Sequence, residues 1–115
     1  MLLLSAALAI CQPGPRSHCI VDGDTLWLEG EKIRLLDIDT PEMQGRCEYE
    51  NRLARQARAR LVQLMNAGPY RIERDGTDRY GRTLARVSVN GRDVGQVLVR
   101  EGLARPYGTG RRSWC

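Results

Sequence analysis

Residues 19–36 contain three short strand-like stretches rich in apolar and β-branched side chains, and turn signals separate these stretches. The stretches are residues 19–21, 25–28 and 32–36, with Asp22-Gly23 in the first gap and Glu29-Gly30-Glu31 in the second. A period of two places successive side chains on opposite faces of a strand, and glycine in such gaps favours tight turns. The pattern therefore predicts a meander of three short strands.

The next stretch, residues 48–65, repeats its apolar residues at helical spacing, and Asn66-Ala67-Gly68-Pro69 follows it as a stop signal. The apolar face would consist of Leu53, Ala57, Leu61, Leu64 and Met65. Arginines occupy much of the remaining surface. We predict an amphipathic helix, whose basic face is either a solvated surface or a binding stripe; the pattern favours the solvated surface.

The second half of the chain predicts two more strands and a short helix. Residues 70–74 and 83–89 are strand-like, and the polar residues 75–82 join them. After the turn signal Asn90-Gly91, Asp93 can cap a helix, with Gln96 as its capping-box partner and Gly102 as its stop. Residues 105–115 show no periodicity.

The order of these elements is strand, strand, strand, helix, strand, strand, helix. We therefore expect an α+β fold that is mainly β, a five-stranded OB-fold barrel with two helices, an architecture that commonly binds oligonucleotides. A fold by itself gives no activity, so function has to be argued from particular residues.

The first seventeen residues differ from the rest of the chain. Residues 1–10 are apolar but too short to span a bilayer, and Ala7-Leu8-Ala9 has the form of a signal-peptide cleavage site without a basic region before it. Residues 12–17 are rich in proline and glycine. We interpret 1–17 as a leader and linker, a signal-peptide remnant, and 18–115 as the domain. A misplaced start codon, or a first strand or short helix of the domain, are the alternatives.

Composition limits the core and the chemistry. The chain has no phenylalanine, so its core must consist of Leu, Ile and Val. Eighteen basic residues against 14 acidic ones give a net charge of +4, which attracts anions. All the basic residues except Lys32 are arginines, which bind phosphate with two N–H groups, although genomic base composition could give the same bias. His18 is the only histidine, which excludes mechanisms that need two imidazoles.

The chain has four cysteines: Cys11, Cys19, Cys47 and Cys115. They form no C-x-x-C pair, which argues against a zinc knuckle or a thioredoxin-like site. An even number in a small basic chain favours disulfides and an oxidising compartment, whereas four free thiols in a cytosolic protein are the alternative. Of the three pairings, we favour Cys11 with Cys19 and Cys47 with Cys115, because the second ties an irregular tail to the body.

Acids and arginines alternate in three segments, residues 21–25, 34–42 and 78–82. Carboxylates supply the hard oxygen ligands of Ca²⁺ or Mg²⁺, and arginines supply fixed donors to a phosphate. Neither Asp22 nor Asp37 begins a loop with EF-hand spacing, so a metal site must be assembled from separate strands. Strict alternation would place Arg34 and Asp39 on opposite faces, and we therefore predict a bend or bulge near Asp37.

These segments resemble the thermonuclease family, the staphylococcal-nuclease-like OB-fold nucleases. The matching stretches are VDGDTLWL, EKIRLLDIDTPE, DRYGRTLARV and, more weakly, VLVREGLA, which run in order from about Cys19 to Ala104. The resemblance implies a Ca²⁺-dependent phosphodiesterase that acts on DNA and RNA. It also implies that the third, C-terminal helix of longer members is missing here.

The resemblance assigns roles to individual residues. Asp24, Asp39 and the backbone carbonyl of Thr40 would bind Ca²⁺. Glu42 would be the general base, and Arg34 and Arg82 would bind the scissile phosphate. Arg79 and Tyr80 would contact a flanking phosphate and nucleotide, and Asp22 would lie in the outer shell.

We thus expect a secreted or periplasmic monomer with DNA and RNA as substrates and no membrane partner. The alternative is a noncatalytic OB-fold module that binds nucleic acid or protein, although such modules usually lose several of these acids and arginines. In the tail, Tyr107 and Trp114 could stack on bases, or Trp114 could instead pack against the domain beside Cys115 in a structural role.

Overall fold

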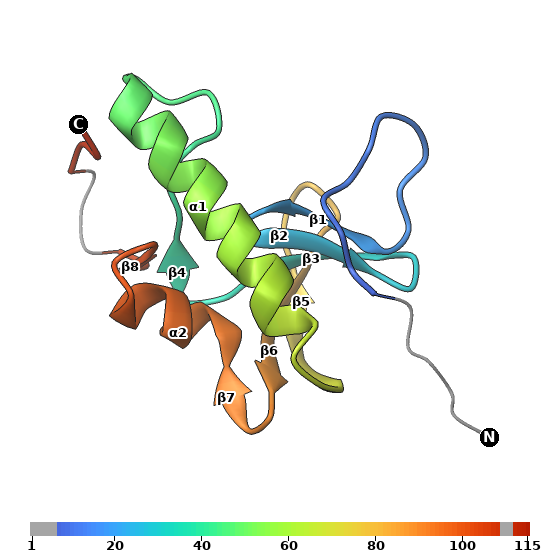
Figure 1. Cartoon of the computed structure of the whole chain (residues 1–115). Coiled ribbons are helices and arrows are strands. Elements are labelled where there is room, and N and C mark those ends of the chain that lie inside the picture. The colour runs from blue at the N-terminus through green and yellow to red at the C-terminus, as the bar shows by residue number, and fades with distance from the viewer. Residues whose placement is uncertain (1–6, 109–111) are drawn as a thin grey trace.

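A computed structural model of the chain describes residues 7–108 and 112–115 (Figure 1). These residues form an α+β domain with one mixed sheet and two helices. The strands are β1 (Cys19–Asp22), β2 (Thr25–Leu28), β3 (Glu31–Leu35), β4 (Ile38–Asp39), β5 (Tyr70–Thr77), β6 (Thr83–Val89), β7 (Arg92–Asp93) and β8 (Arg105–Pro106). The helices are α1 (Glu48–Met65) and α2 (Val94–Arg100). The predicted strands and both predicted helices are present; β4, β7 and β8 were not predicted.

The main sheet has the order β1-β2-β3-β6-β5, and β7 pairs with β6. Its first three strands form the predicted antiparallel meander, whereas β3 and β6 pair in parallel. Strands β4 and β8 form a separate antiparallel ribbon. This order brings the ends of β1 and β3 and the start of β6 together, and closure of the sheet into an OB barrel stays a prediction.

Two tight turns fix the register of the hairpins. Glu29 and Gly30, between β2 and β3, have φ of 50° and 86°, and Asn90 and Gly91, between β6 and β7, have φ of 54° and 74°. Positive φ at both central residues is the mark of a type I′ turn, whose twist matches that of the flanking strands. The Asn-Gly turn was predicted from the sequence.

Helix α1 covers one face of the sheet (Figure 1). Its buried residues are Glu50, Ala54, Ala57, Leu61 and Met65. A Cβ on Gly23, in the turn between β1 and β2, would lie only 2.8 Å from Cβ of Ala57, so the helix packs directly on that turn. Helix α2 begins as predicted, because the side chain of Asp93 accepts a hydrogen bond from the Gln96 amide at 3.0 Å.

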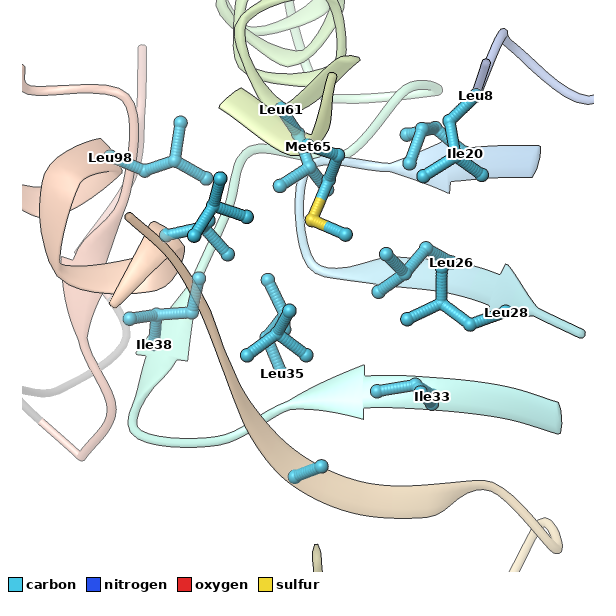
Figure 2. Packing of buried hydrophobic residues seen from close by; sticks show 14 of the residues in the cluster. Leu8, Ile20, Leu26, Leu28, Ile33, Leu35, Ile38, Leu61, Met65 and Leu98 are labelled. Atoms are coloured by element: carbon cyan, nitrogen blue, oxygen red, sulfur yellow. The ribbon is translucent and has the colours of Figure 1, made fainter. Parts of the chain in front are cut away.

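The core consists of aliphatic side chains, as the absence of phenylalanine predicts. Figure 2 shows Leu61 and Met65 of α1 beside Ile20 of β1 and facing the sheet. Burying each such side chain stabilises the fold by roughly 1.5–3 kcal/mol relative to leaving it exposed. The core therefore joins α1 to the strands that carry the acidic turn between β1 and β2.

Residues that precede the predicted domain also contact this core. Leu8 is buried beside Ile20 (Figure 2). Its amide donates to Oδ1 of Asn66 at 2.8 Å, and Ile10 forms a parallel bridge with Ile20. Residues 1–6 of the predicted leader lie outside the described residues, and the start of the mature protein stays a prediction.

Two disulfides join the four cysteines in the predicted pairing. Cys11 pairs with Cys19, with their Cα atoms 4.9 Å apart, and Cys47 pairs with Cys115, with their Cα atoms 6.2 Å apart. The second bond attaches the C-terminal residues to the residue that precedes α1. Figure 1 shows those residues close to the start of α1.

Candidate active site

Arg34 lies at the centre of the acidic and basic residues that the sequence singled out. Its Nη2 atom is 3.0 Å from Oδ1 of Asp39 and 3.5 Å from Oδ2 of Asp24, and only 15% of its side chain is exposed. Because the guanidinium contacts both carboxylates, it holds an acid of the turn between β1 and β2 and an acid of β4 at one point. The Arg34 and Asp24 side chains are mostly buried, which strengthens the interaction between them, whereas 49% of the Asp39 side chain is exposed.

The chain bends where the alternation of the sequence required it. Strand β3 ends at Leu35, β4 begins at Ile38, and Asp37 between them has φ of 72°. Such a left-handed conformation is uncommon outside glycine, though aspartate adopts it more readily than most residues. The bend turns Asp39 to the same side as Arg34, and Asp37 itself pairs with Arg86 at 2.8 Å.

These residues surround a hollow of about 250 Å³, which we call the acid–arginine hollow. Its walls are Asp22, Asp24, Thr25, Arg34, Asp39, Thr40, Pro41, Glu42 and Arg82. All the predicted site residues line it except Arg79 and Tyr80. The turn between β1 and β2, the bend after β3 and the start of β6 each contribute residues, so the site depends on the tertiary fold.

The carboxylates of the hollow repel one another. Partial burial, followed by the negative charges of Asp24 and Asp22, raises the pKa of Glu42 above its ordinary value. Burial and the charge of Asp24 likewise raise the pKa of Asp22. A cation in the hollow would relieve this repulsion, and a carboxylate with a raised pKa is a stronger base.

Arg82 is held by Asp78, a residue to which the sequence analysis gave no role. Nε of Arg82 donates to Oδ2 of Asp78 at 2.6 Å, and the Arg82 and Tyr80 amides both donate to Oδ1 at 2.9 Å. One carboxylate therefore closes the loop between β5 and β6 and aims the arginine. The signal was present in the sequence, since aspartate at the start of a polar loop commonly accepts such hydrogen bonds.

Arg79 and Tyr80 lie on the outside of that loop. The Tyr80 side chain is 67% exposed, and the Arg79 and Arg82 guanidinium carbons are 5.0 Å and 5.5 Å from its ring centroid. The structure thus places the pair beside Arg82 at the surface and outside the hollow.

Glu50 is a second residue, besides Asp78, to which the sequence analysis gave no role. It is only 5% exposed, and its carboxylate accepts the amide N–H groups of Glu42 at 3.1 Å and Arg46 at 3.0 Å. A Cβ on Gly45 would lie 2.5 Å from this side chain, so the loop closes tightly around the carboxylate. The sequence could have indicated its burial through the helical spacing, because Glu50 lies one turn before Ala54 on the apolar face of α1.

The hollow offers a divalent cation oxygen ligands. Asp24 and Asp39 converge on Arg34, and their carboxylates are the hard ligands that Ca²⁺ and Mg²⁺ require. Among the described residues there is no group of three or more His, Cys, Asp or Glu side chains that could hold a metal. The donor set fits an ion that takes its remaining ligands from backbone carbonyl, water or substrate oxygens.

The fold and the site define a small α+β domain in which acids and arginines from separate elements meet at one hollow. Residues 32–113 match the family model described as staphylococcal nuclease homologue. The chain belongs to this family.

Three curated relatives are similar to the chain. Endonuclease YncB of Bacillus subtilis is 39% identical over 92 residues, which cover 74% of this chain and 44% of the relative. The SPbeta prophage-derived endonuclease YokF of the same organism is also 39% identical over 92 residues, 74% of this chain and 31% of the relative. Succinoglycan biosynthesis protein ExoI of Rhizobium meliloti is 30% identical over 109 residues, 90% of this chain and 57% of the relative. The chain thus spans less than two thirds of each relative.

In the part of the chain that the structure describes, neither helix has the length and apolar character needed to cross a membrane.

Proposed function

We propose that this protein is a Ca²⁺-dependent nuclease that hydrolyses phosphodiester bonds of DNA and RNA. The observation that carries the proposal is the convergence of Asp24, Arg34, Asp39, Glu42 and Arg82 on one hollow. The family and the two relatives named endonucleases support it. A noncatalytic binding module would have no need of a base beside paired acids and arginines.

Asp24, Asp39 and the Thr40 carbonyl would hold Ca²⁺, which when bound supplies positive charge next to the phosphate. Arg34 would bind a phosphate oxygen while Asp24 and Asp39 keep its guanidinium in place. Arg82, fixed by Asp78, would bind the same phosphate from the β6 side. Both arginines then face the oxygens on which negative charge develops during attack, where fixed donors have their largest effect.

Glu42 would take the proton of the attacking water. Its raised pKa suits a base, and it lies at the rim of the hollow, where water can reach it. Glu50 holds the Glu42 backbone amide, so the position of the base is set by the buried end of α1. The proton would pass from water to the Glu42 carboxylate as the new P–O bond forms, and the leaving oxygen would take a proton from solvent water as its bond to phosphorus breaks.

Arg79, Tyr80 and Asp22 would act around the cation and the cleaved phosphate. Arg79 and Tyr80 lie at the surface next to Arg82, where a flanking phosphate and nucleotide would pass. Asp22 would orient the groups that surround the cation.

We also propose that the protein is a monomer that acts after export, in the periplasm or outside the cell. Its two disulfides support export, because disulfides are typical of oxidising compartments.

Plasmid digestion tests the proposal. The wild-type protein should cut supercoiled plasmid in millimolar Ca²⁺ and leave it intact in chelator, and a parallel reaction with Mg²⁺ measures the preference between the ions. Folded protein that retards DNA in a gel but leaves it uncut in Ca²⁺ would show that the noncatalytic module is correct.

A further inference from the structure

A second and larger hollow lies beside the acid–arginine hollow. Its volume is about 630 Å³, and the two hollows share Asp39, Thr40 and Glu42. Its outer wall comes from the C-terminal tail, by which we mean residues 105–108 and 112–115. A chain bound at Arg34 and passing Glu42 would therefore enter this tail hollow directly.

The tail wall is fixed to the body of the domain at several points. β8 pairs with β4, which places Arg105 opposite Asp39. The Arg105 guanidinium donates to the backbone carbonyl oxygens of Arg112 at 2.8 Å and Ser113 at 3.2 Å. Its central carbon lies 3.7 Å from the ring centroid of Trp114. With the disulfide from Cys115, these contacts make the wall a built structure.

Two arginines of the tail hollow are available to a ligand. Arg46 and Arg112 both line it and are exposed. Neither guanidinium forms an ion pair or a hydrogen bond with another residue in the described part of the chain. The Arg105 guanidinium, by contrast, donates hydrogen bonds to backbone carbonyl oxygens of the tail. Tyr107 lies on the same wall with 71% of its side chain exposed.

We propose that the tail hollow binds part of a single polynucleotide strand, namely the stretch next to the cleaved phosphate on the Glu42 side. This inference rests on the proposed nuclease function. Arg46 and Arg112 bind phosphates of that stretch, and the exposed ring of Tyr107 stacks on a base. Guanidinium groups are well suited to phosphate, and aromatic faces accept any base. The hollow has the size of small-ligand sites, about 300–1,000 Å³, which suits one or two nucleotides of an unpaired strand.

Binding without cleavage tests this inference. The probe is a fluorescently labelled single-stranded DNA of eight nucleotides, and its anisotropy is measured in chelator over a series of salt concentrations. Arg46→Ala with Arg112→Ala should weaken binding by about tenfold or more. Loss of two phosphate contacts should also reduce the slope of log K against log salt by about 1.4, at about 0.7 per contact.

Matched control variants distinguish binding at the tail hollow from a general effect of positive charge on the surface. Arg71 and Arg100 are exposed and line neither hollow, so Arg71→Ala with Arg100→Ala should keep the wild-type affinity and slope. For the aromatic contact, Tyr107→Ala should weaken binding roughly fivefold or more. Tyr49→Ala should not weaken it, because Tyr49 is exposed on α1 outside both hollows.

Equal losses in the test and control pairs, or a wild-type slope in the Arg46 and Arg112 variant, would overturn the inference. Thermal unfolding of each variant shows that it is folded. Plasmid cleavage in Ca²⁺ by the same wild-type preparation tests the nuclease function separately. Wild-type cleavage together with unchanged binding by the arginine variant would reject the tail site alone, and absent cleavage would reject the nuclease function.

Discussion

At the scale of single residues, the site depends on side chains that hold one another in place. Arg34 lies between Asp24 and Asp39, and Arg82 is paired with Asp78. Each arginine therefore has a defined orientation before any substrate binds. This preorganisation is what allows a charged group to stabilise a transition state without first having to reorient.

Replacing either phosphate-binding arginine by lysine keeps the charge and removes the two-pronged donor. We expect Arg34→Lys or Arg82→Lys to lower kcat/KM on the order of 10² to 10³. The measurement is steady-state cleavage of a fluorogenic oligonucleotide in Ca²⁺. Wild-type kcat/KM in either variant would remove that arginine from the mechanism.

Glu50→Gln tests whether the base is positioned by α1. Glutamine has only one side-chain acceptor oxygen, so at least one of the two amide bonds to Glu42 and Arg46 is lost, and we expect kcat to fall roughly tenfold with little change in KM. The Glu50 charge also raises the Glu42 pKa, so its removal should move the acid limb of the pH–kcat/KM profile to lower pH. Activity belongs to the deprotonated base and is lost as pH falls through its pKa.

Glu48→Gln is the matched control for this measurement, because Glu48 lies in the same helical turn, is exposed and pairs with Arg55. It should keep both the wild-type kcat and the wild-type pH profile. A Glu50 variant whose rate falls through KM alone, with the acid limb unmoved, would contradict the positioning role.

At the scale of elements, the sequence predicted what local patterns encode and missed what distant contacts create. The spacing of apolar residues predicted α1, and Asp93 with Gln96 predicted the start of α2. Strand β8 has no local signal, because its two residues are extended by pairing with β4 across more than sixty positions. The spacing of Glu50 indicates only its buried face, and its partners could not be predicted because they lie in a loop without periodicity.

The two disulfides should contribute unequally to stability. Cys47 and Cys115 are 68 positions apart, whereas Cys11 and Cys19 are 8 apart. Since a crosslink restricts the unfolded chain more when its loop is longer, replacing the long-range pair by serines should cost about 4 kcal/mol, and replacing the short-range pair about 2.5 kcal/mol. Urea unfolding of the two double variants measures this, and the reverse order would contradict the argument.

At the scale of the whole molecule, a small domain places most of its specific chemistry at one end of the sheet. The acid–arginine hollow and the tail hollow adjoin there, and the remaining arginines give the surface a net positive charge. Composition predicted an anionic partner in general. Only the tertiary fold shows which arginines face the carboxylates, because the residues come from separate strands, turns and the tail.

Substrate binding should weaken as salt concentration rises, because arginines that contact phosphates release counterions from the nucleic acid. We expect log K for a single strand to fall linearly with log salt. Fluorescence anisotropy in chelator measures this without cleavage. A flat response would show that the arginine excess does not form a nucleic-acid surface.

We propose above that the acid–arginine hollow cuts phosphodiester bonds with Glu42 as its base. The most direct test compares wild-type protein and Glu42→Gln, purified in parallel, in cleaving a fluorogenic single-stranded oligonucleotide in Ca²⁺. We expect Ca²⁺-dependent cleavage by the wild-type protein and a loss of about 10² to 10⁴ in kcat for the variant, with substrate binding retained. Equal rates for the two proteins, or cleavage that persists in chelator, would contradict it.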